Sequence, residues 1–125
     1  MNDRGEALDT EVLDGLRASV AGDTAFVIEL IDAFLADSEP QVDSIEAAMA
    51  AGDAEALVRP AHTLKSAGAT LGVTRLSAVA RTLELAGRSG SLAGADAMAA
   101  AEGIRAEWQA AASALRAWGA AQVDR

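Results

Sequence analysis

The chain has 125 residues, no cysteine and a formal net charge of −9, a size that fits one domain with its own core. The missing thiols exclude a disulfide framework, a thiolate metal site and a cysteine nucleophile. The basic residues are scattered along an acidic sequence, which argues against nucleic acid as a partner. No apolar run or signal-like start suggests a membrane segment, so we expect a soluble cytoplasmic protein that does not bind membranes.

The predicted elements are all helices, as the low aromatic content of 3% and the many alanines favour. The first helix is expected after Asp9, which is placed to cap it, and the sequence AGD at 21–23 ends it. The second helix is expected over 24–39, and its apolar residues span an arc of roughly 200°. This arc is wider than a single neighbouring helix can cover. Pro40 is predicted to open a third helix with an inward seam of Val42, Ile45 and Met49.

Three further helices follow in the sequence. Asp53 is predicted to cap a helix that reaches to Gly72, and the next helix runs from Thr74 to about Arg88. The last helix, over about 91–120, carries an inward stripe. Its members are Ala97, Ala101, Ile104, Trp108, Ala111, Leu115 and Trp118. We therefore predict an all-α fold, an antiparallel up-and-down four-helix bundle with one or two extra N-terminal helices, over residues 1–125 as a single domain.

The chain's only histidine, His62, lies on the helix before Gly72. A lone histidine is more often a core or ordinary surface residue than a working one. The apolar seam of this helix falls on one line at about 100° per residue. It consists of Leu57, Ala61, Leu64, Gly68 and Leu71. Because His62 is about 140° from that line and Ser66 about 180°, we expect both side chains at the surface.

The residues beside His62 suit phosphoryl chemistry. A neutral imidazole is a competent nucleophile, and a phosphoryl group on it would need a nearby cation and a hydroxyl donor. Lys65 and Ser66 are placed to supply them, three and four residues along the helix. Since there is no second histidine, no metal site is expected, and without a glycine-rich phosphate loop no ATP site is expected either.

These residues resemble the histidine phosphotransfer (HPt) domains of phosphorelays. The segments AHTLKSA at 61–67 and LG at 71–72 match the family's core pattern, and the similarity extends over about 8–88. The resemblance implies that His62 accepts a phosphoryl group on Nε2 from a receiver-domain aspartyl phosphate and passes it to another receiver. It also implies that Lys65 neutralises the phosphate. Ser66 departs from the family's usual glycine at a position beside the imidazole, and Pro60 within the helix is a second unusual feature.

Two more site residues follow from the turn at 72–74. If the helices on either side fold back on each other, residues whose numbers sum to about 146 lie level, which places Glu84 opposite His62 and Arg81 opposite Lys65. Glu84 is then positioned to accept a hydrogen bond from Nδ1 and leave Nε2 free. Arg81 would add positive field. The alternative for both residues is an ordinary solvated helix charge.

The resemblance also implies partners. We expect an apolar docking patch beside His62 for response-regulator receiver domains and a hybrid histidine kinase. Its expected members are Phe26, Ile28 and Leu35 from the wide apolar arc, together with Ala69. The alternative is that the first helix covers the apolar arc. The protein is expected to be a monomer, not an enzyme, and to hold no cofactor, with Mg²⁺ on the receiver. The competing function is a helical adaptor that docks receivers without accepting phosphate.

Overall fold

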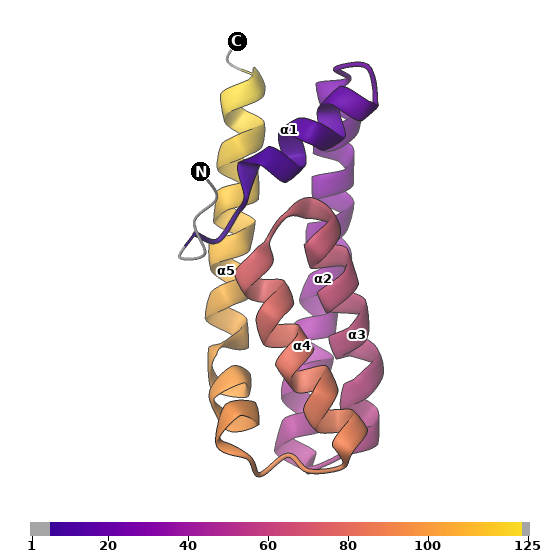
Figure 1. Cartoon of the computed structure of the whole chain (residues 1–125), viewed down its shortest axis with the longest axis vertical. Helices are drawn as coiled ribbons and strands as arrows, with labels where there is room; N and C mark the ends of the chain where they lie inside the picture. Colours follow the sequence, from indigo (N-terminus) through magenta and orange to yellow (C-terminus); the bar gives the residue numbers. More distant parts are fainter. Residues whose placement is uncertain (1–5, 124–125) are drawn as a thin grey trace.

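The computed structural model describes residues 6–123, and over that range the chain forms five α-helices (Figure 1). They are α1 (Thr10–Ser19), α2 (Thr24–Ala51), α3 (Ala54–Leu71), α4 (Thr74–Ser89) and α5 (Ala95–Val123). Residues 1–5 and 124–125, the two ends of the predicted domain, lie outside the described part. Among the described helices none is both long enough and apolar enough to cross a membrane. The predicted all-α class is confirmed.

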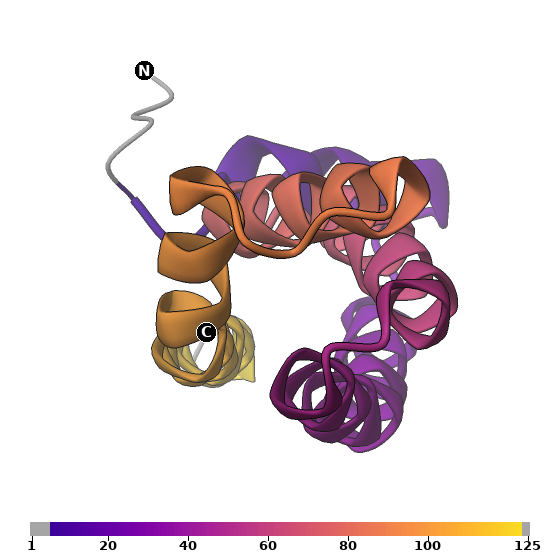
Figure 2. The same ribbon diagram turned by 90° about the horizontal axis from the view of Figure 1, so that it is seen from below.

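Helices α2 to α5 surround a common core (Figures 1 and 2). Each of them packs on the next one in the chain, and α5 returns to contact α2, whereas α1 crosses one end of the assembly against α2 and α3. The core is made of large aliphatic side chains that are fully buried, each stabilising the fold by about 1.5–3 kcal/mol. Among them are Leu13, Val27, Ile45, Leu57, Leu64, Leu76, Leu83, Ile104 and Leu115.

The predicted helix ends are confirmed at the caps. The side chain of Asp9 accepts a hydrogen bond from the backbone N–H of Glu11, and Asp53 accepts from that of Ala56. Each bond satisfies a donor that the first turn leaves free. Gly72 ends α3 with φ of 82°, a left-handed conformation that favours glycine. These short connections hold α2, α3 and α4 in fixed registers.

The predicted break at Pro40 is wrong, because α2 continues through this residue from Thr24 to Ala51. A proline inside a helix removes one backbone hydrogen bond and costs about 3 kcal/mol. The buried stripe of α2 continues on both sides of Pro40, so packing along the whole helix outweighs that cost. Its residues are Val27, Ile31, Phe34, Leu35, Ser38, Val42, Ile45 and Ala48. One extra N-terminal helix, α1, therefore accompanies α2 to α5. Helix α3 likewise runs through Pro60.

Two glycines leave little room between helices α3 and α4. A Cβ atom on Gly87 would lie 2.9 Å from both the carbonyl oxygen of Ala54 and a methyl group of Val58. A Cβ atom on Gly68 would lie 3.3 Å from a methyl group of Val73. Because these positions lack side chains, the two backbones pack tightly at both ends, and residues midway along α4 are brought against His62.

Candidate functional site around His62

Helix α3 presents His62 to solvent. The predicted seam of α3 is buried, and the histidine side chain on the opposite side is 52% exposed. Ser66 and Ala69, farther along the same face, are also exposed, and Lys65 is half-buried. The hydroxyl of Ser66 has no hydrogen-bond partner among the described residues. The imidazole therefore stands on an open face with small neighbours, as its helical position predicted.

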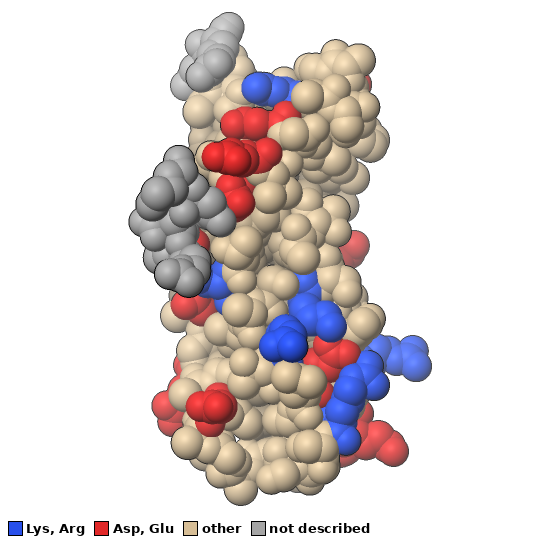
Figure 3. Space-filling view, viewed as in Figure 1, with Lys and Arg blue, Asp and Glu red and all other residues tan. Residues whose placement is uncertain are grey.

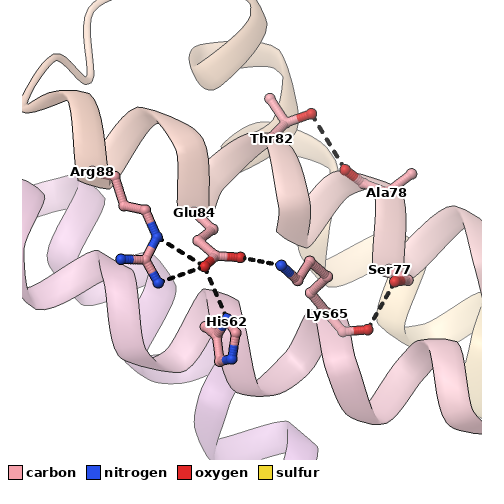
Figure 4. A network of polar contacts seen from close by, with 7 residues as sticks. All are labelled: His62, Lys65, Ser77, Ala78, Thr82, Glu84 and Arg88. Carbon is pink, nitrogen blue, oxygen red and sulfur yellow. Dashed lines mark hydrogen bonds and ion pairs between the residues drawn. The ribbon is translucent and has the colours of Figure 1, made fainter.

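Glu84 on α4 joins the basic groups around His62 (Figure 4). Its Oε2 atom lies 2.9 Å from Nδ1 of His62, and its Oε1 atom lies 2.7 Å from Nζ of Lys65. Arg88 donates to Oε2 from both Nε, at 2.9 Å, and the terminal guanidinium nitrogen, at 2.7 Å. Glu84 is only 5% exposed, so its charge is desolvated and compensated by these contacts. The prediction that Glu84 lies opposite His62 is confirmed. The alternative, that Glu84 is an ordinary solvated charge on its helix, is excluded.

The carboxylate of Glu84 fixes the proton on His62. The hydrogen bond from Lys65 lowers the pKa of Glu84 to about 2 against the opposing effect of burial, with further lowering by Arg88 and His62. An ionised carboxylate only accepts hydrogen bonds, so the 2.9 Å contact requires a proton on Nδ1 of His62. In the neutral ring Nε2 then carries the free lone pair, and Figure 4 shows this second nitrogen pointing away from Glu84.

Arg88 is a site residue that sequence reasoning missed. It lies one helical turn after Glu84 on α4, and a Glu–Arg pair at this spacing is a recognisable signal. The signal was too common to single out before Glu84 was known to be buried. Arg81, which was predicted to add positive field, is exposed and makes no hydrogen bond or ion pair with His62, Lys65 or Glu84 in the described chain.

The predicted docking patch is wrong in part. Leu35 is buried at 8% exposure, since it belongs to the inward stripe of α2, and is not available to a partner. Phe26 is exposed and Ile28 half-buried, but both lie near the start of α2. Because α2 and α3 are antiparallel around Gly52, these two residues are more than about 20 Å along the axis from the level of His62. Neither is beside the histidine.

An apolar groove near His62 lies instead between α2 and α3. Its volume is about 350 Å³, and it begins at Thr63, the residue after the histidine. The walls are lined by Leu30, Phe34, Asp37, Ser38 and Gln41 from α2 and by Thr63, Leu64, Ala67, Thr70 and Leu71 from α3. The side chains of Leu30 and Phe34 on α2 form part of this groove.

The basic residues are less scattered than the linear sequence suggests. Five of the ten lie on α3 and α4, which together carry only two acidic residues, Glu55 and Glu84. The basic residues are Arg59, Lys65, Arg75, Arg81 and Arg88. This pair of helices thus has a net charge of +3 in a chain of −9, and Figure 3 shows basic side chains gathered over α3 and α4. Helix α3, which carries His62, and its neighbour α4 therefore hold a local excess of basic residues.

Comparison with known proteins identifies the family of the chain. The model of the Hpt domain family matches residues 29–118. Among solved structures, the chain is similar to histidine-containing phosphotransfer protein B (HptB) from Pseudomonas aeruginosa PAO1, with 30% sequence identity and a TM-score of 0.78. The match covers 92% of this chain and 96% of that one. No curated protein matches the sequence. The chain therefore belongs to the Hpt domain family, the histidine phosphotransfer domains of phosphorelays.

Proposed function

We propose that this protein is a phosphorelay carrier that accepts a phosphoryl group on Nε2 of His62 from the aspartyl phosphate of one receiver domain and transfers it to another. The observation that carries the proposal is the arrangement of the imidazole, whose Nδ1 is bound to buried Glu84 while the ring itself is 52% exposed. A histidine that only packed against its neighbours or capped a helix would not need Nδ1 held by a hydrogen bond and Nε2 free of one.

The transfer is a displacement at phosphorus. The lone pair of Nε2 attacks, the bond between phosphorus and the aspartyl oxygen breaks, and the receiver's carboxylate leaves with the electron pair. Phosphoryl transfer asks the protein mainly for positioning and charge stabilisation. Lys65, half-exposed three residues from His62, and the unengaged hydroxyl of Ser66 would stabilise the phosphoryl oxygens. The receiver would supply Mg²⁺ and its acidic pocket, so the carrier needs no ATP site and turns over no small substrate.

Two surfaces support a receiver domain as the partner. The groove between α2 and α3 offers an apolar surface next to His62, where a helix of the partner would bury its own apolar side chains. The excess of basic residues on α3 and α4 is complementary to an acidic phosphorylation pocket and would steer its approach. Ala69 lies on this exposed face of α3 and stays a predicted contact. We propose receiver domains, and a hybrid histidine kinase that contains one, as the partners of a monomeric carrier.

The test separates the chemistry from docking. Phosphoramidate, a small phosphoryl donor, and a phosphorylated receiver domain are each used to label the wild-type protein, His62→Gln and Ser66→Leu. We expect His62→Gln to accept no phosphate from either donor while its circular dichroism stays helical. Ser66→Leu adds bulk on the exposed face beside the imidazole, so we expect labelling by phosphoramidate to persist and transfer from the receiver to fall. Full, acid-labile labelling of His62→Gln would contradict the proposal.

The second candidate is an adaptor that docks receiver domains without accepting phosphate. The groove and the basic face would serve that function equally well, but it gives no role to the network of His62, Lys65 and Glu84. Tight binding of a receiver by the wild-type protein, with no transfer from phosphorylated receiver and no labelling by phosphoramidate, would favour the adaptor.

A further inference from the structure

The phosphorylated ring of His62 has two possible forms. Attack by Nε2 gives a ring that holds the phosphoryl group on one nitrogen, still holds a proton on Nδ1, and carries a positive charge. In that form the ring is ready to leave as neutral imidazole when the phosphoryl group moves on. If the Nδ1 proton is lost, the ring becomes neutral, and its departure from phosphorus would expel an imidazolate anion, a much poorer leaving group. A carrier must load and unload, so retention of this proton decides how fast it unloads.

We propose that Glu84 is a positioning residue that keeps the proton on Nδ1 of phosphorylated His62, so that the phosphoryl group stays transferable through neutral and mildly alkaline pH. This inference rests on the proposed function of His62. It assigns Glu84 a role after phosphorylation, when the free tautomer of the ring no longer matters. No bond to Glu84 forms or breaks in either direction of transfer; the carboxylate accepts the same hydrogen bond throughout.

His62 and Lys65 contact different oxygens of Glu84. The two oxygens of Glu84 divide their partners, since Lys65 binds Oε1 while His62 and Arg88 bind Oε2. If Lys65 turns towards a phosphoryl group on His62, only Oε1 loses its partner. Arg88 still donates two hydrogen bonds to Oε2, so that oxygen stays in place against Nδ1. Arg88 thereby allows one lysine to serve the phosphate without releasing the glutamate.

Other charges around the ring act in the opposite direction or are engaged elsewhere. Apart from Glu84, the neighbouring charged groups on α3 and α4 are basic, and they disfavour a positive ring. They are Arg59, Lys65, Arg81 and Arg88. From α2, Asp37 lines the groove that starts at Thr63. The acidic residues of α2 nearer the level of His62 face α5, where Asp43 and Glu46 bind Arg105. On α5, Glu107 binds Arg75. Glu84 is thus the carboxylate that contacts the ring in the described chain.

The experiment follows the ring proton directly. Wild-type protein, Glu84→Gln and the control Glu107→Gln are labelled with phosphoramidate, and the ³¹P and ring ¹⁵N signals are followed as the pH is raised. Glu107 is a matched control because it is an ion-paired glutamate away from His62. We expect the ring of the wild type and of the control to keep its proton to a pH at least about one unit higher than in Glu84→Gln, the effect of a contacting opposite charge.

Transfer to a receiver gives the second measurement. At pH values above both titrations, a loss of one unit lowers the protonated fraction of the ring to about one tenth of the wild-type fraction. We therefore expect transfer from phosphorylated Glu84→Gln to be about tenfold slower there and near the wild-type rate at pH 6. Glu84→Asp, which keeps the charge but withdraws it by one methylene, should fall between the two. If Glu84→Gln does not fold, as judged by circular dichroism, Glu84→Asp decides the result.

Two outcomes point to different failures. Equal titrations of the phosphorylated ring in the wild type and the folded Glu84 variant would overturn this inference while leaving His62 as the phosphoryl acceptor. Failure of the wild-type protein to take up phosphate from phosphoramidate and from a phosphorylated receiver would overturn the proposed function itself.

Discussion

Acid should destabilise this fold through one buried side chain, Glu84. Its pKa is lowered from 4.5 to about 2, chiefly by the hydrogen bond from Lys65. Folding therefore favours the ionised form, and this contribution to stability is complete above pH 4.5 and is lost as the pH falls through about 2. At 1.36 kcal/mol per pH unit, the shift corresponds to about 3 kcal/mol. That is a large part of the stability of a domain of this size, which is about 5–15 kcal/mol.

The assay is urea unfolding followed by circular dichroism, repeated at several pH values between neutrality and pH 2. We expect Glu84→Gln to lower the free energy of unfolding by about 3 kcal/mol at pH 7, and the difference from the wild type to shrink as the pH approaches 2. Glu107→Gln is the control for removing an ion-paired carboxylate. A constant difference between Glu84→Gln and the wild type across the whole pH range would refute the reasoning, because the loss would then not depend on ionisation.

Three further predictions concern packing and association. Gly87→Ala should lower the free energy of unfolding by about 1–3 kcal/mol, because its Cβ would lie 2.9 Å from atoms of α3. An unchanged free energy in urea unfolding would mean that α3 and α4 have space for a methyl group at this position. Ser38→Ala should lower the free energy of unfolding by about 1–3 kcal/mol in the same assay, since it removes the acceptor that lies 2.7 Å from the buried indole N–H of Trp108. An unchanged unfolding midpoint would argue against that hydrogen bond. Arg81→Glu should slow association with a receiver, measured by stopped flow, by a factor that shrinks as salt is added. Arg116→Glu on α5 is the matched control, and equal slowing by both would argue against a special role for the α3–α4 face.

Local patterns in the sequence were enough to predict much of the site. The seam of α3 is a matter of helical period, so the exposure of His62 and Ser66 followed from counting residues. The level of Glu84 with His62 followed from a short turn at Gly72, because a short connection between antiparallel helices leaves little freedom in their register. The cap residues Asp9 and Asp53 act within their own first turns, so neighbouring sequence was sufficient for them as well.

Only the tertiary structure decided which interactions win where local signals conflict. Pro40 is a helix breaker by local rules, yet α2 stays whole because α3 and α5 bury it on both sides of the proline. Leu35 looks like surplus apolar surface on one helix but is covered in the assembled fold. The sequence by itself determined which face of α3 is buried and that His62 is exposed. Packing determined how far Glu84 is buried and that Arg88 shares its carboxylate, because burial and charge compensation depend on all neighbouring helices at once.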